Sequence, residues 1–224
     1  MRAVHRIIIA AIVAGASFSP AGAQNPAQPA PPPSAPAPAA PTPPMTPPAA
    51  TTPPLAGART TLLPEAGDPA NVDEVMLTAK PVLVVAGTSD WDNGLKNIRA
   101  ATARVETELK RLGITPTGRP LVVYTQTNDD NFKFDAMVPV ASAPTTPPAD
   151  LPKEMRFGET PAGKAWRFVH KGPYDDIDST YETVTTYLEA KDIVARDAFI
   201  EEFVTDTTDP ADANLEVNIF VQPK

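Results

Sequence analysis

The sequence predicts an α+β domain in which two βαββ halves form one antiparallel sheet. Apolar residues recur three or four positions apart in two segments, and this spacing is typical of helices that pack against a sheet. Each segment is followed by two short runs rich in β-branched and aromatic residues, separated by a polar turn. The same order of elements occurs twice. We therefore expect a duplicated domain with its two main helices on one side of the sheet and a groove on the other.

The first half begins with a buried strand over residues 81–87 (PVLVVAG) and continues with a helix over residues 91–112. The apolar stripe of this helix consists of Leu95, Ile98, Thr102, Val105, Leu109 and Leu112. Gly113 lies where a helix C-cap belongs. Residues 121–125 and 132–140 are then expected to pair as strands.

The second half repeats this order. Residues 164–169 predict a strand, and the turn His170-Lys171-Gly172-Pro173-Tyr174 leads into a helix over residues 177–191. The helix stripe consists of Ile177, Tyr181, Val184 and Leu188. Residues 198–204 and 215–221 predict a closing strand pair across a D-T-T-D-P turn. We expect His170 to be an exposed turn residue without a catalytic role.

Short stretches of the two halves correspond at an offset of about eighty residues. Residues 121–124 (LVVY) match residues 200–203 (IEEF), 112–114 match 191–193, and 137–139 (MVP) match 221–223 (VQP). The identity is slight, so the order of elements is what repeats.

The second half carries a family resemblance. A strand, the H-K-G-P-Y turn, a helix, the E-E-F strand, the D-T-T-D-P loop and a last strand ending in V-Q-P resemble the GyrI-like effector-binding domain family of bacterial transcription activators. The resemblance covers residues 71–223 and implies a small-molecule-binding domain. In the regulators of that family the domain is fused to a helix-turn-helix, whereas here a signal peptide and a spacer are expected instead. We therefore expect neither a one-component transcription switch nor a cytoplasmic gyrase inhibitor.

The beginning of the chain has the pattern of a secretory signal peptide. Arg2 and Arg6 precede an apolar run over residues 7–16, and Ala21-Gly22-Ala23 forms an A-x-A cleavage site. The run is short for a permanent membrane anchor, and the chain has no cysteine for a lipid anchor. We expect residues 1–23 to be removed and the protein to be periplasmic or secreted.

Residues 24–70 predict a disordered spacer rich in Pro and Ala, and residues 71–224 predict the folded domain. The spacer is expected to be a stalk, and a ligand for a proline-binding partner in the cell envelope is the alternative.

Composition excludes several function classes. Two of the 19 basic residues lie in the leader, so cleavage leaves 17 basic and 27 acidic residues and a formal charge of −10. An acidic chain without a basic stripe argues against a nucleic-acid partner. The absence of cysteine excludes disulfides and thiolate chemistry. One histidine remains outside the leader, so we expect no metal site, and no motif indicates a cofactor.

Strand alternation predicts the ligand site. One set of strand side chains is aliphatic and is expected to face the helices; it includes Ile200, Val204, Val217 and Ile219. The other set is aromatic with one carboxylate and is expected to line the groove. This set consists of Trp166, Phe168, Phe199, Glu201, Phe203, Asn218 and Phe220.

The predicted ligand is a hydrophobic or cationic small molecule, because aromatic faces and a carboxylate both attract a lipophilic cation. In the GyrI-like family a Glu-x-Tyr pair marks the groove; Glu201 fits the Glu, and Phe203 replaces the Tyr. Whether Glu201 or Glu202 is the pocket carboxylate stays open. Two other functions stay open as well. The resemblance also implies a hydrolase of small electrophilic molecules, which would use Glu201 with Trp166 and Tyr174 or Tyr181. The other alternative is an envelope protein-interaction module.

Overall fold

The computed structural model describes residues 59–206 and 209–224, so the predicted leader and most of the predicted spacer lie outside the described residues. Eight strands form one sheet in the order β1-β6-β8-β7-β3-β4-β2-β5, and every neighbouring pair is antiparallel. The strands are β1 (Asp73–Leu77), β2 (Pro81–Asp90), β3 (Leu121–Thr127), β4 (Asn131–Pro139), β5 (Met155–Glu159), β6 (Gly163–Lys171), β7 (Ile200–Phe203) and β8 (Glu216–Val221).

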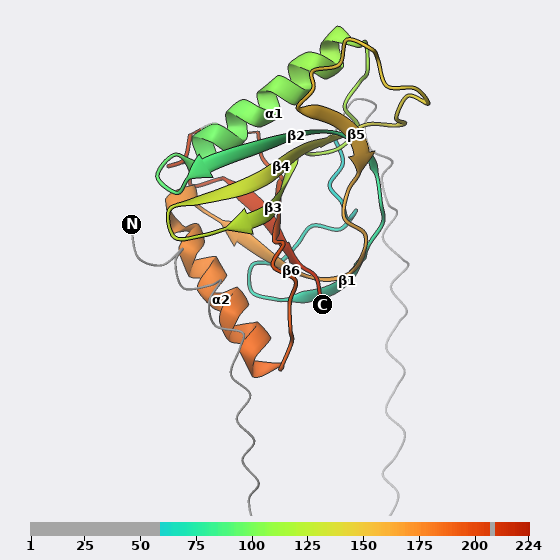
Figure 1. The fold of residues 1–224 in the computed structure, drawn as a ribbon. Coiled ribbons are helices and arrows are strands. Elements are labelled where there is room, and N and C mark those ends of the chain that lie inside the picture. The colour runs from blue at the N-terminus through green and yellow to red at the C-terminus, as the bar shows by residue number, and fades with distance from the viewer. Residues whose placement is uncertain (1–58, 207–208) are drawn as a thin grey trace, which may run out of the picture. The chain divides into compact units, whose positions relative to one another are not determined.

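Two helices cover one face of this sheet (Figure 1), as the sequence predicted. They are α1 (Gly94–Arg111) and α2 (Ile177–Ala190), and the short 3-10 helix η1 (Tyr174–Asp176) leads into α2. The predicted stripe of α2 is buried throughout, whereas Leu95 at the start of α1 is only partly buried. Both stripes join one core with side chains from the same face of the sheet.

Neither α1 nor α2, the α-helices of the described residues, is long and apolar enough to cross a membrane.

The strand register confirms the duplication. In the central pair β3–β7, Val122 lies opposite Glu201, and these two residues also correspond in the sequence repeat. The pseudo-twofold axis therefore passes between them, at the middle of the sheet. Gly113 and Asp192 end the two helices with positive φ angles of 69° and 52°, so the same left-handed C-cap occurs at both corresponding positions.

The outer strands β1 and β5 were not predicted. β1 precedes the first half but pairs with β6 of the second half, and β5 precedes the second half but pairs with β2 of the first. Charged residues such as Glu74 and Arg156 interrupt both strands. They therefore lack the apolar run of a central strand, as is usual for edge strands.

The face opposite the helices is covered in part by residues 59–66. Leu62 is buried there against Leu77, Val82 and Phe220. Its backbone N–H donates a 2.5 Å hydrogen bond to Glu202, and Lys80 Nζ donates to the Thr61 carbonyl at 2.8 Å. The packed part of the chain thus includes residues before residue 71, the first residue of the predicted domain.

Candidate ligand-binding site

Glu201 occupies the centre of the sheet, on the face that the helices cover, and is fully buried. Tyr181 of α2 donates a hydrogen bond to its Oε1 at 2.6 Å. Tyr174 of η1 donates to its Oε2 at 2.9 Å, and the hydroxyl of Tyr124 lies 3.4 Å from that of Tyr174. These four residues are called the Glu201 cluster below. Both carboxylate oxygens thus accept a hydrogen bond, as a buried carboxylate requires.

The tyrosines of the Glu201 cluster are held protonated. Burial raises the pKa of Tyr124, Tyr174 and Tyr181 well above the usual 10.0, and the negative charge of Glu201 raises it further. Both causes disfavour the phenolate. The three hydroxyls therefore remain hydrogen-bond donors over the whole physiological pH range.

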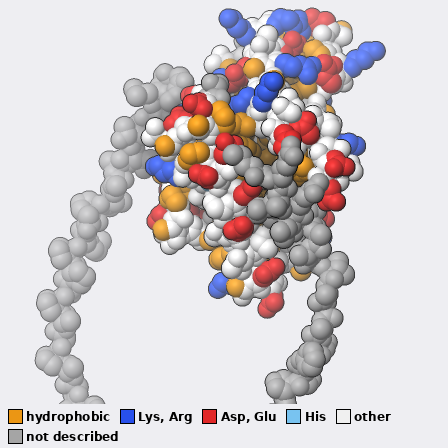
Figure 2. Space-filling view, turned by 90° about the vertical axis from the view of Figure 1, so that its left-hand side faces the viewer, with side chains coloured by type: hydrophobic (Ala, Val, Ile, Leu, Met, Phe, Trp, Pro, Cys, Tyr) orange, Lys and Arg blue, Asp and Glu red, His pale blue; other side chains and the backbone are white. Residues whose placement is uncertain are grey.

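A hollow of about 440 Å³ opens beside this cluster. Its lining consists of Trp91, Asp92, Gly94, Leu95, Lys96, Arg99, Tyr124, Phe132, Tyr174, Asp175 and Pro210. The hollow therefore lies where α1 begins and where η1 precedes α2, on the face of the sheet that the helices cover. From the sequence we expected the ligand groove on the opposite face. Figure 2 views the domain from the side on which α1 begins and shows acidic side chains spread over this surface, with basic ones gathered at its top.

Aromatic rings form the apolar part of the lining. The centroids of Trp91 and Phe132 are 4.7 Å apart, and those of Tyr124 and Phe132 are 5.2 Å apart. Tyr174 belongs both to the lining and to the Glu201 cluster. Glu201 is not part of the lining, so the hollow reaches its carboxylate through the tyrosine hydroxyls.

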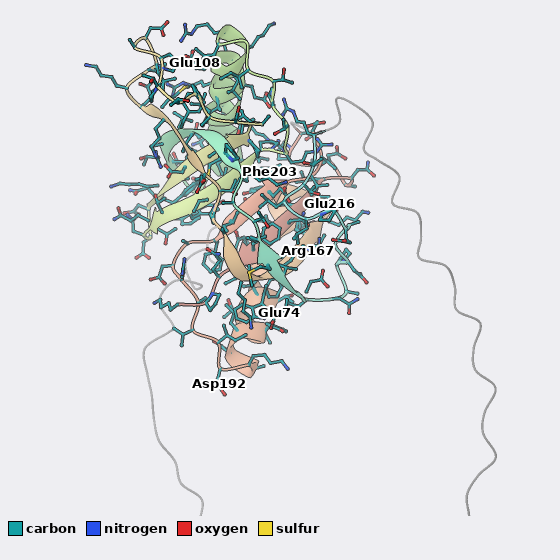
Figure 3. The ribbon with its side chains drawn as sticks, turned by 90° about the vertical axis from the view of Figure 1, so that its right-hand side faces the viewer. Glu74, Glu108, Arg167, Asp192, Phe203 and Glu216 are labelled. Carbon is teal, nitrogen blue, oxygen red and sulfur yellow. The ribbon has the colours of Figure 1, made fainter. Side chains whose placement is uncertain are left out.

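Arg99 is a cationic side chain in this lining. Its guanidinium carbon lies 4.3 Å from the ring centroid of Phe203, a cation–π distance, and Phe203 stacks on Tyr174 at 6.3 Å. Figure 3 marks Phe203 near the middle of the sheet, between Glu108 of α1 and Asp192, which follows α2. Burial lowers the pKa of Arg99, although Tyr174 and nearby carboxylates oppose this effect.

Five of the predicted site residues share one face, as alternation indicated. Glu201, Phe203, Phe199, Phe168 and Trp166 all join the helix-side packing. Phe199 and Tyr181 pack in a T-shaped arrangement, and so do Phe168 and Tyr187 of α2. Phe168 and Trp166 therefore pack in the core and are not part of the lining of the hollow. Their predicted ligand contact stays a prediction.

The predicted positions of Asn218 and Phe220 on that face are wrong. β8 pairs with β7 so that Ile219 lies opposite Glu201, whereas Asn218 lies opposite Glu202 and Phe220 opposite Ile200. Both side chains therefore point away from the helices. The expected aliphatic set divides as well: Val217 and Ile219 face the helices, but Ile200 does not.

Glu202 lies on the side of β7 away from the hollow. It is fully buried and accepts hydrogen bonds from Asn218 Nδ2 at 2.9 Å and from the Leu62 N–H at 2.5 Å. Burial raises its pKa. The geometry thus connects Glu201, and not Glu202, with the hollow through Tyr174.

His170 is buried rather than exposed. Its Nδ1 lies 2.9 Å from Thr180 Oγ1, and its Nε2 lies 3.0 Å from the Pro173 carbonyl. The ring therefore joins the end of β6 to the start of α2, where Gly172 has a φ of 134°. Among the residues that the structure describes, no group of three or more histidine or acidic side chains is arranged to hold a metal ion.

The first half supplies the lining residues that sequence reasoning missed. Trp91, Arg99, Tyr124 and Phe132 all belong to it. The repeat contained a usable signal, because Tyr124 corresponds to Phe203, which was itself among the predicted site residues. Arg99 had no such signal in the sequence.

Comparison with known proteins agrees with this architecture. The C-terminal domain of EcmrR superposes with a TM-score of 0.57 at 17% identity, over 69% of this chain and 97% of that domain. EcmrR in a complex with DNA gives a TM-score of 0.56 at 17% identity over 69% of this chain, and the match spans only 58% of that protein. A hydrolase from Listeria innocua gives a TM-score of 0.46 at 12% identity, over 68% of this chain and 91% of the hydrolase. At 17% identity the likeness to EcmrR concerns the fold alone.

No curated protein matches the sequence. A family model, the GyrI-like small molecule binding domain, matches residues 70–224, which is more than half of the chain. The match begins one residue before the predicted domain and extends to the last residue. The chain therefore belongs to the GyrI-like small-molecule-binding family.

Proposed function

We propose that this protein is an exported binding protein that takes a small hydrophobic, ring-containing molecule into the hollow beside α1. The observation that carries the proposal is the lining itself. Trp91, Tyr124, Phe132 and Tyr174 surround a space of about 440 Å³. Concave sites of this size with aromatic walls and few polar groups are typical of small-molecule pockets.

The ligand class follows from which groups face the hollow. Glu201 stands behind Tyr174, and both its oxygens accept hydrogen bonds from tyrosines. Ring stacking and apolar contact therefore provide most of the affinity, and the hydroxyls of Tyr124 and Tyr174 offer contacts to a polar substituent. The cationic ligand expected from the sequence would be attracted to the Glu201 carboxylate only across the phenol of Tyr174, which lies between them.

Tryptophan fluorescence tests this site directly, because the chain has two tryptophans and only Trp91 lines the hollow. Trp166→Phe leaves Trp91 as the reporter, and we expect aromatic ligands to change its emission saturably. Trp91→Phe leaves the buried Trp166 as the reporter and serves as the matched control, with no saturable change expected. Equal responses from the two variants would place the ligand elsewhere.

Export is proposed from the arginines, the apolar run and the Ala21-Gly22-Ala23 site. Protein recovered from the native host should begin at or near Gln24 in amino-terminal sequencing. A soluble cytoplasmic pool that retains residues 1–23 would refute the proposal.

Hydrolysis of a small electrophilic molecule is the second candidate, because a buried carboxylate with two tyrosine donors is an arrangement that can take up and return a proton. If this is the function, ester or strained-ring substrates should turn over. Glu201→Gln should then lower kcat by about two orders of magnitude or more while ligand binding is retained. Turnover that is unchanged in Glu201→Gln would exclude this role.

A further inference from the structure

We propose that the hollow selects ring compounds that carry an anionic group, an aromatic carboxylate being the simplest, and that Arg99 binds this group. The inference rests on the proposed function, because it concerns the ligand of the same hollow. The proposed anionic ligand differs from the cationic ligand that the sequence suggested.

Arg99 has hydrogen-bond donors without acceptors. Its Nε and Nη2 atoms are buried, and within residues 59–206 and 209–224 neither has a hydrogen-bond partner. A guanidinium has five N–H donors in a planar fork that matches the two oxygens of a carboxylate. Buried donors without acceptors are costly, so an anion that reaches them from the hollow would satisfy groups that the described protein leaves open.

Most other arginines of the described domain pair with a carboxylate. Arg104 pairs with Glu154, Arg111 with Glu108 at 2.6 Å and Arg167 with Asp73 at 2.6 Å. Arg99 packs instead over the ring of Phe203, 4.3 Å from its centroid. That contact holds the flat guanidinium against the aromatic floor while its N–H groups keep their capacity to bind an anion.

The beginning of α1 adds a second positive contribution. Gly94, Leu95 and Lys96 from its first turn line the same hollow. The N-cap residue Asn93 makes no side-chain cap, and the first turn contains no acidic residue. The Asp90 carboxylate accepts the N–H of Asn93 at 2.8 Å, but it lies before the helix and is exposed. The first backbone N–H groups of a helix lack intrahelical acceptors, and together with the helix dipole they favour an anion nearby.

The carboxylates around the hollow do not cancel this preference. Asp92 and Asp175 also line it, but both are exposed, so solvent and salt screen their charges. Glu201 has its two tyrosine donors, and Glu106 and Asp206 act on Arg99 only through longer-range attraction. Glu201 is a buried anion that also attracts Arg99, but its two oxygens accept hydrogen bonds from Tyr174 and Tyr181. Asp92 and Asp175 act at the rim of the hollow.

Three probes with one ring system separate charge from shape: 2-naphthoate, 2-naphthamide and 2-naphthylmethylammonium. Calorimetric titration of the wild-type protein should give an affinity for naphthoate about tenfold or more above that for naphthamide, with the ammonium weakest. Arg99→Gln should remove this preference by weakening naphthoate, while naphthamide changes by less than about threefold. Arg99→Lys should retain part of it, because the charge remains and the fork is lost.

Arg104→Gln is the matched control, since it removes a cation from the same helix at an exposed ion pair, and it should leave all three affinities unchanged. Wild-type protein that binds naphthamide or the ammonium as tightly as naphthoate would overturn the inference and leave the proposed function intact. Equal losses of affinity for naphthoate and naphthamide in Arg99→Gln would also overturn the inference, because Arg99 would then maintain the shape of the hollow and not bind the charged group. Failure of all three probes to bind, together with a silent Trp91, would refute the proposed function itself. If Arg99→Gln does not fold, the order of the three affinities in the wild-type protein and in Arg99→Lys still tests whether Arg99 selects the anionic probe.

Discussion

The hydrogen bond from Tyr181 Oη to Glu201 Oε1 joins α2 to the middle of the sheet. It is 2.6 Å long, and its two residues are 6% and 0% exposed. Tyr181→Phe removes the hydroxyl and keeps the ring, which also packs against Phe199 in a T-shaped arrangement. One oxygen of a fully buried carboxylate then loses this donor.

The expected loss follows from this burial. A hydrogen bond to a charged acceptor contributes about 1.5–3 kcal/mol to the free energy of unfolding, and a buried acceptor without its donor retains the desolvation cost. For a domain of this size, 1 kcal/mol corresponds to about 2–4 °C in Tm. We therefore expect Tyr181→Phe to lower Tm by about 3–12 °C.

Tyr187→Phe provides the control on the same helix. Tyr187 contacts the ring of Phe168 edge-on, so the variant keeps the aromatic packing there and loses only a hydroxyl. Urea unfolding at neutral pH should show a change of less than about 0.5 kcal/mol for Tyr187→Phe, against the larger loss in Tyr181→Phe. Equal changes in the two variants would mean that the Glu201 cluster contributes nothing specific to stability.

Three further outcomes follow from the structure. The tyrosines of the Glu201 cluster have pKa values raised above 10.0 when folded, so the native state retains protons that the unfolded state loses. Stability should therefore be full below about pH 10 and fall as pH rises beyond it. Tyr187→Phe leaves these three as the chain's tyrosines, and phenolate absorbance that appears before unfolding in this variant would contradict the expectation. Leu62→Ala should lower the free energy of unfolding by about 2–3 kcal/mol, because Leu62 is only 7% exposed on the face opposite the helices. Leu63→Ala is the control at a partly buried position and should have a smaller effect. A larger loss in Leu63→Ala than in Leu62→Ala would refute the packing of this segment. Gly113→Ala should cost about 1 kcal/mol in urea unfolding, since its φ is 69° and an L side chain there is strained; an unchanged midpoint would contradict the predicted C-cap strain.

The duplicated core could be predicted because its signals are local. Helix stripes depend on spacing within one segment, and the stripe of Ile177, Tyr181, Val184 and Leu188 is buried as predicted. The C-cap at Gly113 depends on one residue. By contrast, β1 and β5 are held at the edges by pairing with the opposite half, and nothing in their own short, charged sequences specifies this partner.

The site was predicted only in part because both faces of the sheet are covered. All four residues of β7 are buried, and so are five of the six in β8. Alternation then sorts side chains into two sets within each strand, but no polar face fixes which set faces the helices or how neighbouring strands align. Glu201 and its tyrosine partners were among the candidates, whereas Asn218 and Phe220 were assigned to the wrong face.

The pseudo-twofold axis explains why the site is asymmetric. Val122 and Glu201 lie opposite each other at this axis, so a strict repeat would place two carboxylates side by side in the core. Like charges at such a distance are strongly unfavourable. Here one half supplies the carboxylate with Tyr181, and the other supplies Val122 together with Thr102, the residue that corresponds to Tyr181 in the helix stripe. The first half therefore has no buried carboxylate at this position. It contributes Arg99 and the aromatic lining residues Trp91, Tyr124 and Phe132 instead. Duplication of the fold thus yields one composite site rather than two equivalent ones.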